Sequence, residues 1–229
     1  MKFGVTQTFA CNYLPDKEER LLVCMEQESE LQGLYNSLIQ VGFRRSGEQL
    51  YRPHCENCKA CESIRIICAK FLPSKSQKRV LSKNKDVQIQ VVNSERDDYY
   101  ALYEHYIAKY HHDGSMFPAT YEQYRSFVHC DWNKPCFIEG RVDDKLIGVA
   151  VTDTITNGLS ALYTFFEPSM AKRSLGTFFI LQQIRIAIEK ELPYLYLGYQ
   201  IDECNKMNYK QKFFPHQRLR DNQWILSTK

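Results

Sequence analysis

Residues 136–166, CFIEGRVDDKLIGVAVTDTITNGLSALYTFF, carry the clearest structural signal in the chain. The stretch contains three runs rich in β-branched and aromatic residues, which favour strands. Two turn signals separate the runs, Asp143-Asp144 and Asn157-Gly158, and Asn-Gly is among the strongest short hairpin signals. We therefore expect three consecutive antiparallel strands here.

Alternating and helical patterns continue on both sides of this stretch. The expected elements from residue 87 are a strand at 87–92, a helix at 95–111 capped by Ser94, a helix capped by Thr120, the three strands, a helix at 178–191, a strand at 194–199, a basic helical segment at 205–215 and a last strand at 224–226. This order resembles the acyltransferase fold of the GNAT superfamily of N-acetyltransferases. The resemblance implies an α/β (α+β) architecture, a mixed sheet with flanking helices.

The first third of the chain is less regular. The 229 residues are 44% hydrophobic, enough for one large domain or two small ones. Residues 21–43 begin strand-like and become helical. We expect a small cysteine-containing N-terminal domain over residues 1–72, a basic connector over 73–86, and an acyltransferase-like catalytic domain over 87–229.

Positive charge is concentrated in part of the chain. The net charge is +3, but residues 44–86 hold eleven Lys and Arg against four acids, a local net charge of +7. A second basic run covers residues 206–220. Such clustering suits a polyanion such as RNA. The alternative is an ordinary solvated basic face.

The apolar segments and the cysteines of the sequence indicate the cellular compartment that we expect for this protein. No stretch approaches the roughly 18 apolar residues of a membrane span, and residues 1–20 show no apolar signal core. We expect a cytoplasmic protein with no membrane contact. Nine cysteines, an odd number, argue against a disulfide framework in that reducing compartment.

Several longer stretches resemble one family. They are CNYLPDKEER, GFRRSG, YRPHCENCKACESIRI, LYTFFEPS, SLGTFFILQQI, PYLYLGY and KMNYKQKFFP. Together they resemble the bacterial aspartate/glutamate leucyltransferases, short relatives of the arginyl-tRNA–protein transferases. The resemblance implies an aminoacyltransferase that moves leucine from leucyl-tRNA onto proteins with N-terminal Asp or Glu, without a cofactor. It also implies that the product enters the N-degron pathway through a Clp-type protease.

The fold resemblance places the chemistry in the cleft between strands 159–166 and 194–199. Our catalytic candidates there are Tyr163, Thr164, Tyr199 and Gln200. A tyrosine hydroxyl is suited to relay a proton to the leaving ribose oxygen. The alternative is that each tyrosine is simply packed in the core.

A second group of residues is suited to hold the aminoacyl-tRNA. It comprises Lys172, Arg173, Gly176, Lys206, Asn208, Tyr209 and Lys210. Arg173 and Gly176 match the superfamily's pyrophosphate loop at a helix N-terminus, and Lys172 beside them is suited to meet phosphate there. Phe178, however, stands where that loop has a small residue, which argues against ordinary coenzyme A binding. The last four lie beyond the fifth strand, where the alternative is a plain amphipathic helix.

The acidic acceptor needs fixed positive charge, because Asn and Gln match Asp and Glu in shape. Arginine suits this task because its planar fork grips a carboxylate with two hydrogen bonds. The candidates are Arg44, Arg45, Arg52, His54 and Arg65. We favour Arg52 and Arg65. Arg44 and Arg45 serve equally well as ligands of RNA phosphate.

Three cysteines recur at a spacing typical of metal sites: Cys55, Cys58 and Cys61. A tetrahedral site needs four ligands, and Cys11 or His54 is available as the fourth. The resulting centre is a structural zinc or, by resemblance to the arginyl relatives, an iron–sulfur cluster. The alternative is a set of small buried thiols that shape a loop beside the acyl cleft.

Three rival functions stay open on sequence alone. They are an arginyl-tRNA–protein transferase, an acetyl-coenzyme A-dependent N-acetyltransferase, and a non-catalytic RNA-binding module. A pocket for arginine needs a carboxylate, because a buried guanidinium without a partner is costly, whereas a leucine pocket is apolar.

Overall fold

The computed structural model describes residues 1–114 and 116–228. Its helices are α1 (Glu28–Leu38), α2 (Lys75–Lys83), α3 (Tyr99–Tyr110), α4 (Tyr121–Val128) and α5 (Leu175–Glu189), with 3₁₀ turns η1 (Ile39–Val41), η2 (Cys68–Lys70), η3 (Pro168–Arg173) and η4 (Asn208–Lys212). Its strands are β1 (Phe3–Val5), β2 (Phe9–Ala10), β3 (Glu18–Glu19), β4 (Leu21–Cys24), β5 (Arg44–Ser46), β6 (Gln49–Pro53), β7 (Glu62–Ile67), β8 (Gln88–Val92), β9 (Cys136–Val142), β10 (Lys145–Ile155), β11 (Gly158–Phe166), β12 (Tyr194–Gln200), β13 (His216–Arg220) and β14 (Gln223–Ser227).

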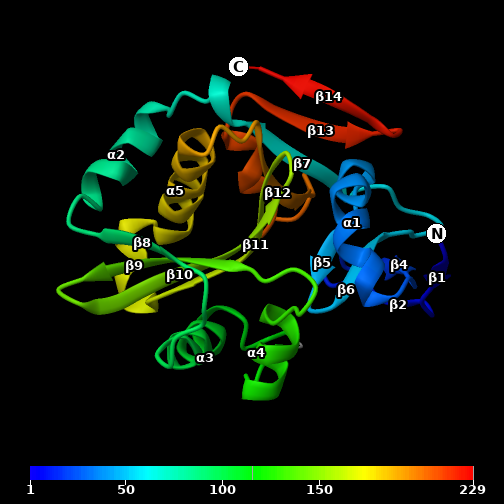
Figure 1. Ribbon diagram of the computed structural model, residues 1–229, viewed down its shortest axis with the longest axis horizontal. Coiled ribbons are helices and arrows are strands. Elements are labelled where there is room, and N and C mark those ends of the chain that lie inside the picture. Colours follow the sequence, from blue (N-terminus) through cyan, green and yellow to red (C-terminus); the bar gives the residue numbers. More distant parts are fainter. Residues whose placement is uncertain (115, 229) are drawn as a thin grey trace.

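An eight-stranded mixed sheet forms the body of the molecule, in the order β14-β13-β7-β12-β11-β10-β9-β8 (Figure 1). Strands β8 to β11 run antiparallel in sequence order, which confirms the three-strand expectation. Helix α5 then crosses over, so that β12 lies parallel to β11. This is a mixed sheet with flanking helices, as the sequence predicts.

The two hairpin turns differ in how well they were predicted. Asp143 and Asp144 form the first turn with φ of 47° and 62°, as expected. In the second hairpin Ile155 pairs with Gly158, so the turn lies one residue earlier than Asn157-Gly158. Gly158 is the first residue of β11, and a glycine is needed there because β12 approaches it closely. A Cβ there would lie 2.3 Å from the carbonyl oxygen of Tyr194.

Helices cover both faces of the sheet (Figure 1). Helices α5 and α2 pack on one face, where Phe179 and Ile184 of α5 are fully buried. Helices α3 and α4 pack on the other face through a mostly aromatic core. Thr120 caps α4 as predicted, accepting the backbone N–H of Gln123 at 3.2 Å.

Helix α3 begins at Tyr99, four residues later than predicted, and Ser94 does not cap it. The preceding residues are bound to the neighbouring sheet instead. Arg96 pairs with Glu139 at 3.1 Å, and Asp98 accepts from Arg141 at 2.8 Å. These contacts hold the chain in a turn before the helix.

Residues 73–86, expected as a connector, form helix α2. Ser74 and Gln77 make a reciprocal capping box at its start. Asn84 ends the helix and donates to the carbonyl of Val80 at 2.8 Å. The S-x-x-Q signal was present in the sequence, but the high charge of the segment obscured it.

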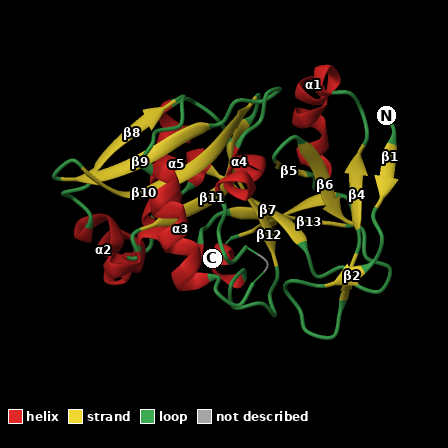
Figure 2. Cartoon of the chain, turned by 90° about the horizontal axis from the view of Figure 1, so that it is seen from below, coloured by secondary structure: helices red, strands yellow, loops and turns green. Residues whose placement is uncertain are grey.

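The N-terminal residues form a smaller unit beside the large sheet (Figure 2). A four-stranded sheet, β1-β4-β6-β5, packs with α1, and Leu31, Tyr35 and Leu38 of α1 are buried. Strand β7 also lies within residues 1–72, but it pairs with β12 and β13 of the large sheet. The N-terminal third therefore supplies a central strand of the main sheet.

None of the helices in residues 1–114 and 116–228 combines the length and apolar character needed to cross a bilayer.

Candidate functional site

The parallel strands β11 and β12 separate along their length. Their pairing runs from Gly158 opposite Tyr194 to Ser160 opposite Tyr196, and ends there. A bulge in β12 between Tyr196 and Gly198 bends it towards β7. We call the gap between residues 161–166 and 197–200 the strand opening. It lies at the carboxyl ends of the strands, where sheets of this class bind ligands.

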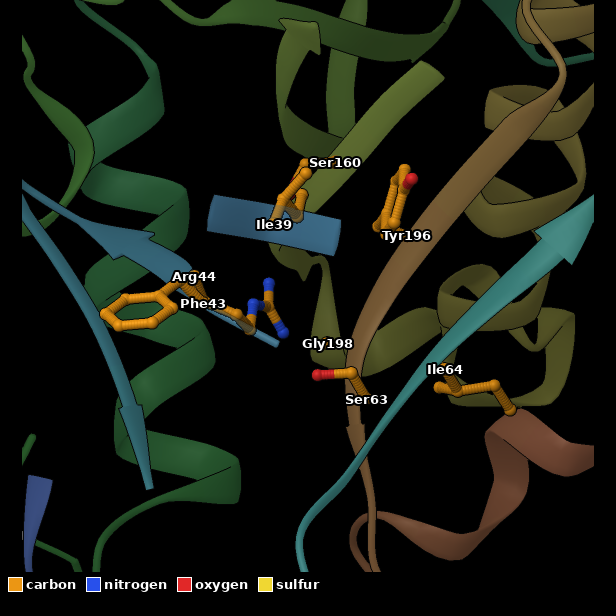
Figure 3. A pocket seen from close by; sticks show the side chains of 8 residues that line it. All are labelled: Ile39, Phe43, Arg44, Ser63, Ile64, Ser160, Tyr196 and Gly198. Carbon is orange, nitrogen blue, oxygen red and sulfur yellow. The ribbon is translucent and has the colours of Figure 1, made fainter. Parts of the chain in front are cut away.

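Arg44 extends from β5 into the strand opening (Figure 3). Its Nη2 donates to the carbonyl oxygen of Ala161 at 2.6 Å. Its guanidinium lies over Gly198, so closely that a Cβ on that residue would be 1.2 Å from Nη1. Gly198 also has φ of 78°, a conformation that side chains disfavour. Gly198 is thus needed for both the bulge and the position of Arg44.

The charge of Arg44 is not balanced by a neighbouring acid. No carboxylate lies within 4.0 Å of its guanidinium among residues 1–114 and 116–228. Beside it is a cavity of about 10 Å³, lined by Ser63, Ser160, Tyr196 and others, which is about the volume of one water molecule. The strand opening therefore presents a half-buried cation with spare hydrogen-bond donors.

Lys210 is the second cation near the strand opening. Its side chain is 5% exposed and donates to the carbonyl oxygen of Tyr199 at 2.5 Å and towards the sulfur of Met207 at 3.4 Å. Burial, aided by the charge of Arg44, lowers the pKa of Lys210 to about 7. A buried lysine is poorly placed to grip an exposed phosphate, but a partly neutral amine can accept a proton.

The catalytic candidates on β12 are buried and mostly engaged. The Tyr199 hydroxyl donates to the carbonyl of Gly42 at 3.0 Å, and burial raises its pKa well above the usual value. Gln200 is fully buried and donates to Asp202 at 2.8 Å. The Oε1 of Gln200 has no hydrogen-bond partner among the described residues. Gln200 is therefore the β12 candidate with a free polar atom.

Of the two candidates on β11, Tyr163 lies in the aromatic core beside α3 and α4. The Tyr163 ring packs edge-on against Phe127 at 5.1 Å, and its hydroxyl approaches the sulfur of Met116 at 4.0 Å. Burial raises the pKa of Tyr163, so it stays protonated. Thr164 is half-buried opposite Ala150 of β10. The structure does not bring these two hydroxyls into contact with Tyr199 or Gln200.

Arg45 points the opposite way from Arg44, as successive strand residues do. Its guanidinium makes a two-point contact with Asp153 at 2.8 and 2.7 Å, and both side chains are fully buried. Burial alone lowers the pKa of Arg45, but Asp153 outweighs this and raises it. Tyr35 also donates to Asp153 at 2.9 Å. Arg45 thus joins the N-terminal unit to β10 and is not free for an acceptor.

Arg65 lies in an aromatic enclosure. Its guanidinium is 3.8 Å from the ring centre of Tyr194 and 4.1 Å from that of Trp224. It donates to the amide oxygens of Gln217 at 2.8 Å and Gln40 at 2.6 Å. These contacts connect β7 with η1 and the C-terminal hairpin, and they occupy Nε and Nη1.

Arg52 and His54 lie on and just beyond β6. Arg52 donates to the carbonyl of Val41 at 2.8 Å and lies over the Phe43 ring. His54 is exposed, and its carbonyl accepts from Arg20 at 3.3 Å. Of the five acceptor candidates, the structure places Arg44 in the strand opening.

The expected phosphate site at the start of α5 is largely filled. Arg173 makes a two-point contact with Asp86 at 2.9 and 2.6 Å. Phe178 is buried in the core, and Gly176 lies against Phe166. Lys172 stays exposed, with no carboxylate partner among residues 1–114 and 116–228. Of these three described residues, Lys172 remains available to bind an anion.

The remaining tRNA candidates lie at the molecular surface around η4. Lys206 is 3.7 Å from Asp113, and both are exposed. Asn208 donates to the carbonyl of Asp202 at 3.4 Å. Tyr209 is 38% exposed. Unlike Lys210, these three side chains remain accessible to a large ligand.

Three of the four cysteines, Cys11, Cys58 and Cys61, pack against a small cluster formed by Leu14, Ile201 and Cys204. Burial, aided by the neighbouring thiols, raises the pKa of Cys61 to about 12. Within the described parts of the chain, however, no three of these sulfurs lie within 4.8 Å of one another. Ligands of one zinc ion are closer than that, so this arrangement does not fit a single zinc ion.

Sequence reasoning missed the roles of two residues. A glycine inside an apolar strand signals a bulge or close backbone approach, so Gly198 could have been found. Lys210 was selected as a residue that holds the 3′ end of the tRNA, and its burial could not be predicted because it depends on contacts distant in sequence.

Comparison with known proteins identifies the family. The models "Arginine-tRNA-protein transferase, N terminus" and "Arginine-tRNA-protein transferase, C terminus" match residues 9–79 and 98–220. The chain is 54% identical to the aspartate/glutamate leucyltransferase of Pseudoalteromonas atlantica, over 100% of this chain and 99% of the relative. It is 48% identical to the leucyltransferases of Aeromonas hydrophila and Shewanella amazonensis, in each case over 98% of this chain and 94% of the relative. The chain therefore belongs to the arginine-tRNA–protein transferase family.

Proposed function

We propose that this protein transfers leucine from leucyl-tRNA to the amino group of proteins that begin with Asp or Glu. Relatives with this activity in their name match the chain from end to end. The observation that carries the proposal is Arg44, a cation without an acid partner inside the strand opening. An acidic acceptor side chain supplies the missing carboxylate.

The reaction needs no covalent intermediate. The donor is an ester between leucine and the terminal ribose of the tRNA. The acceptor amine has an unperturbed pKa near 8 and is partly neutral at cellular pH. The neutral nitrogen attacks the ester carbonyl, the carbon–oxygen bond to ribose breaks, and an amide forms. Holding amine and ester in attack geometry supplies much of the acceleration.

Lys210 is the proposed proton acceptor. In its neutral form its nitrogen takes the proton that the attacking amine loses, and the proton is passed on to the leaving ribose oxygen. A base with a pKa close to the working pH suits this task. A carboxylate bound to Arg44 also cancels the positive field that lowers the pKa of Lys210. Recognition of an acidic acceptor thus makes Lys210 a stronger base.

The rival donors fit less well. Arg173 is bound to Asp86 and Phe178 fills the core, so the start of α5 lacks the open anion site that coenzyme A needs. A pure RNA-binding module gives no reason for an unbalanced arginine between two separated strands. Transfer from arginyl-tRNA uses the same chemistry as transfer from leucyl-tRNA. The two reactions differ in the pocket that binds the donor's amino-acid side chain.

Three further expectations remain part of the proposal. Transfer needs no cofactor, and the reaction takes place in the cytoplasm. The leucylated product passes to a Clp-type protease. A zinc ion held by the four cysteines is not included, because no three of their sulfurs lie within 4.8 Å of one another in the described residues. Metal analysis of untagged protein tests this, and a full equivalent of zinc would reverse the conclusion.

One assay compares the donors directly. The protein is incubated with a peptide beginning with Asp and, separately, with leucyl-tRNA, arginyl-tRNA or acetyl-coenzyme A. We expect leucine on the peptide amine and no transfer from the other two donors. Transfer from arginyl-tRNA alone or acetyl-coenzyme A alone would overturn the proposal.

A further inference from the structure

Helix α2 and its surroundings form a basic surface. On α2 the basic side chains follow helical spacing, so they share one face, while Gln77, Val80, Leu81 and Asn84 occupy the opposite face. Exposed basic residues from the adjacent turns extend this face. The α2 basic face comprises Lys70, Lys75, Lys78, Arg79, Lys83, Lys85 and Lys172.

None of these seven side chains has a carboxylate within 4.0 Å among residues 1–114 and 116–228. The nearby acid, Asp86, is already bound to Arg173. The α2 basic face is therefore an unbalanced patch of positive charge.

The helix is fixed in place beside the strand opening. Asn84 donates to the carbonyl of Arg173 at 3.0 Å, and Gln77 donates to that of Lys212 at 3.3 Å. These two acceptors belong to η3 and η4, the turns that follow β11 and β12. Figure 1 shows α2 alongside α5, at the outer edge of the molecule. A ligand on this face lies beside the turns that follow the two strands bordering the strand opening.

We propose that the α2 basic face binds the phosphate backbone of the donor tRNA and directs its 3′ end to the strand opening. This rests on the proposed leucyl transfer. A membrane surface is the less suitable partner, because membrane-bound helices present an apolar face to the lipid. In α2 the apolar residues Val80 and Leu81 pack towards α5 instead.

The test compares two triple variants of the whole protein. One carries Lys75→Gln, Lys78→Gln and Arg79→Gln, which leaves the capping box of Ser74 and Gln77 intact. The control carries Lys2→Gln, Lys17→Gln and Lys134→Gln, exposed residues distant from α2 with no acid partner in the described chain.

The probe is uncharged leucine tRNA, so that the amino-acid pocket plays no part. Its dissociation constant is measured between about 50 and 200 mM salt. We expect the α2 variant to bind at least about tenfold more weakly at low salt. We also expect the slope of log affinity against log salt to be smaller by about two to three. The control variant should match the native protein.

Three results contradict or separate the claims. Equal binding by the α2 variant and the control overturns the surface. If the α2 variant loses binding to phosphatidylglycerol vesicles but keeps its affinity for tRNA, the α2 basic face binds membranes. That result also overturns the proposal. Weaker tRNA binding together with no leucine transfer by the native protein supports the surface and rejects the proposed function.

Discussion

At the scale of single residues, Arg44 changes the chemistry of Lys210, the second cation near the strand opening. Neither Arg44 nor Lys210 has a carboxylate within 4.0 Å in the described chain. Arginine stays charged under cellular conditions, so the repulsion falls on the lysine. Burial and this repulsion together lower the pKa of Lys210. Cys61 and Cys204 act weakly in the other direction.

Replacing Lys210 should change the pH dependence of transfer. In the native protein, kcat/KM should rise with pH through an apparent pKa of about 7 as Lys210 loses its proton. Lys210→Met and Lys210→Arg should both lose this limb. Their rates should fall by about 100-fold or more, a common contribution of a general base. The limb near pKa 8 that belongs to the acceptor amine should remain.

Stability provides the control for Lys210. The lowered pKa means that the folded state binds fewer protons than the unfolded state between about pH 7 and 10.5. The free energy of unfolding therefore contains a term that rises with pH in this window. In Lys210→Met this term should be absent in urea unfolding from pH 7 to 9. A native-like pH profile of both rate and stability in this variant would remove Lys210 from the mechanism.

Only part of this residue-level picture follows from the sequence. The motif GFRRSG offers two adjacent arginines, and alternation predicts that they point in opposite directions. Which one enters the strand opening depends on how β5 lies against β10 and β11. Those contacts join residues more than 100 positions apart.

At the scale of elements, β12 is shaped by one glycine. Gly198 gives the bulge its positive φ and leaves room for Arg44. Gly198→Ala should lower the free energy of unfolding by about 1–2 kcal/mol, since a residue with a Cβ is strained in this conformation. The new methyl group should also displace Arg44. The KM for the acceptor peptide should therefore rise by more than the loss of folded protein accounts for.

Two measurements check the Gly198 prediction. Urea unfolding gives the stability loss, and steady-state kinetics with an Asp peptide gives KM. Gly33→Ala serves as the matched control, because nothing lies within 4 Å of a Cβ at that helical position. An unchanged acceptor KM in Gly198→Ala would show that Arg44 has no role in acceptor binding.

Local patterns predicted the antiparallel strands and the cap of α4. They did not predict that β7 joins the main sheet, because strand pairing over more than 100 residues leaves no mark on a local pattern. The start of α3 was misplaced for a related reason. Its ion pairs with β9 override the capping preference of Ser94.

At the scale of the whole molecule, the N-terminal unit and the large sheet work as one body. The buried Arg45–Asp153 pair joins them, with Tyr35 as a third member. Arg44 is the residue next to Arg45 on β5, and it reaches the strand opening. The position of Arg44 therefore depends on the Arg45–Asp153 pair, which holds β5 against β10.

Asp153→Asn should destabilise the protein strongly. Removing one charge of a buried pair leaves the other unbalanced, at a typical cost of about 3–5 kcal/mol. The double variant Arg45→Met, Asp153→Leu removes both charges and should recover much of this loss. Thermal or urea unfolding measures both. If Asp153→Asn were as stable as the native protein, this pair would not be what joins the two parts.

The selectivity of the acceptor site tests the account most directly. The ratio of kcat/KM for peptides beginning with Asp and with Asn is measured in the native protein, Arg44→Gln, Arg44→Lys and the matched control Arg52→Gln. Loss of a desolvated charge pair costs about 2–5 kcal/mol, so Arg44→Gln should lose at least about 30-fold with the Asp peptide. Its rate with the Asn peptide should change little, and Arg44→Lys should recover part of the loss. An unchanged Asp-to-Asn ratio in Arg44→Gln, or the same collapse in Arg52→Gln, would contradict the assignment.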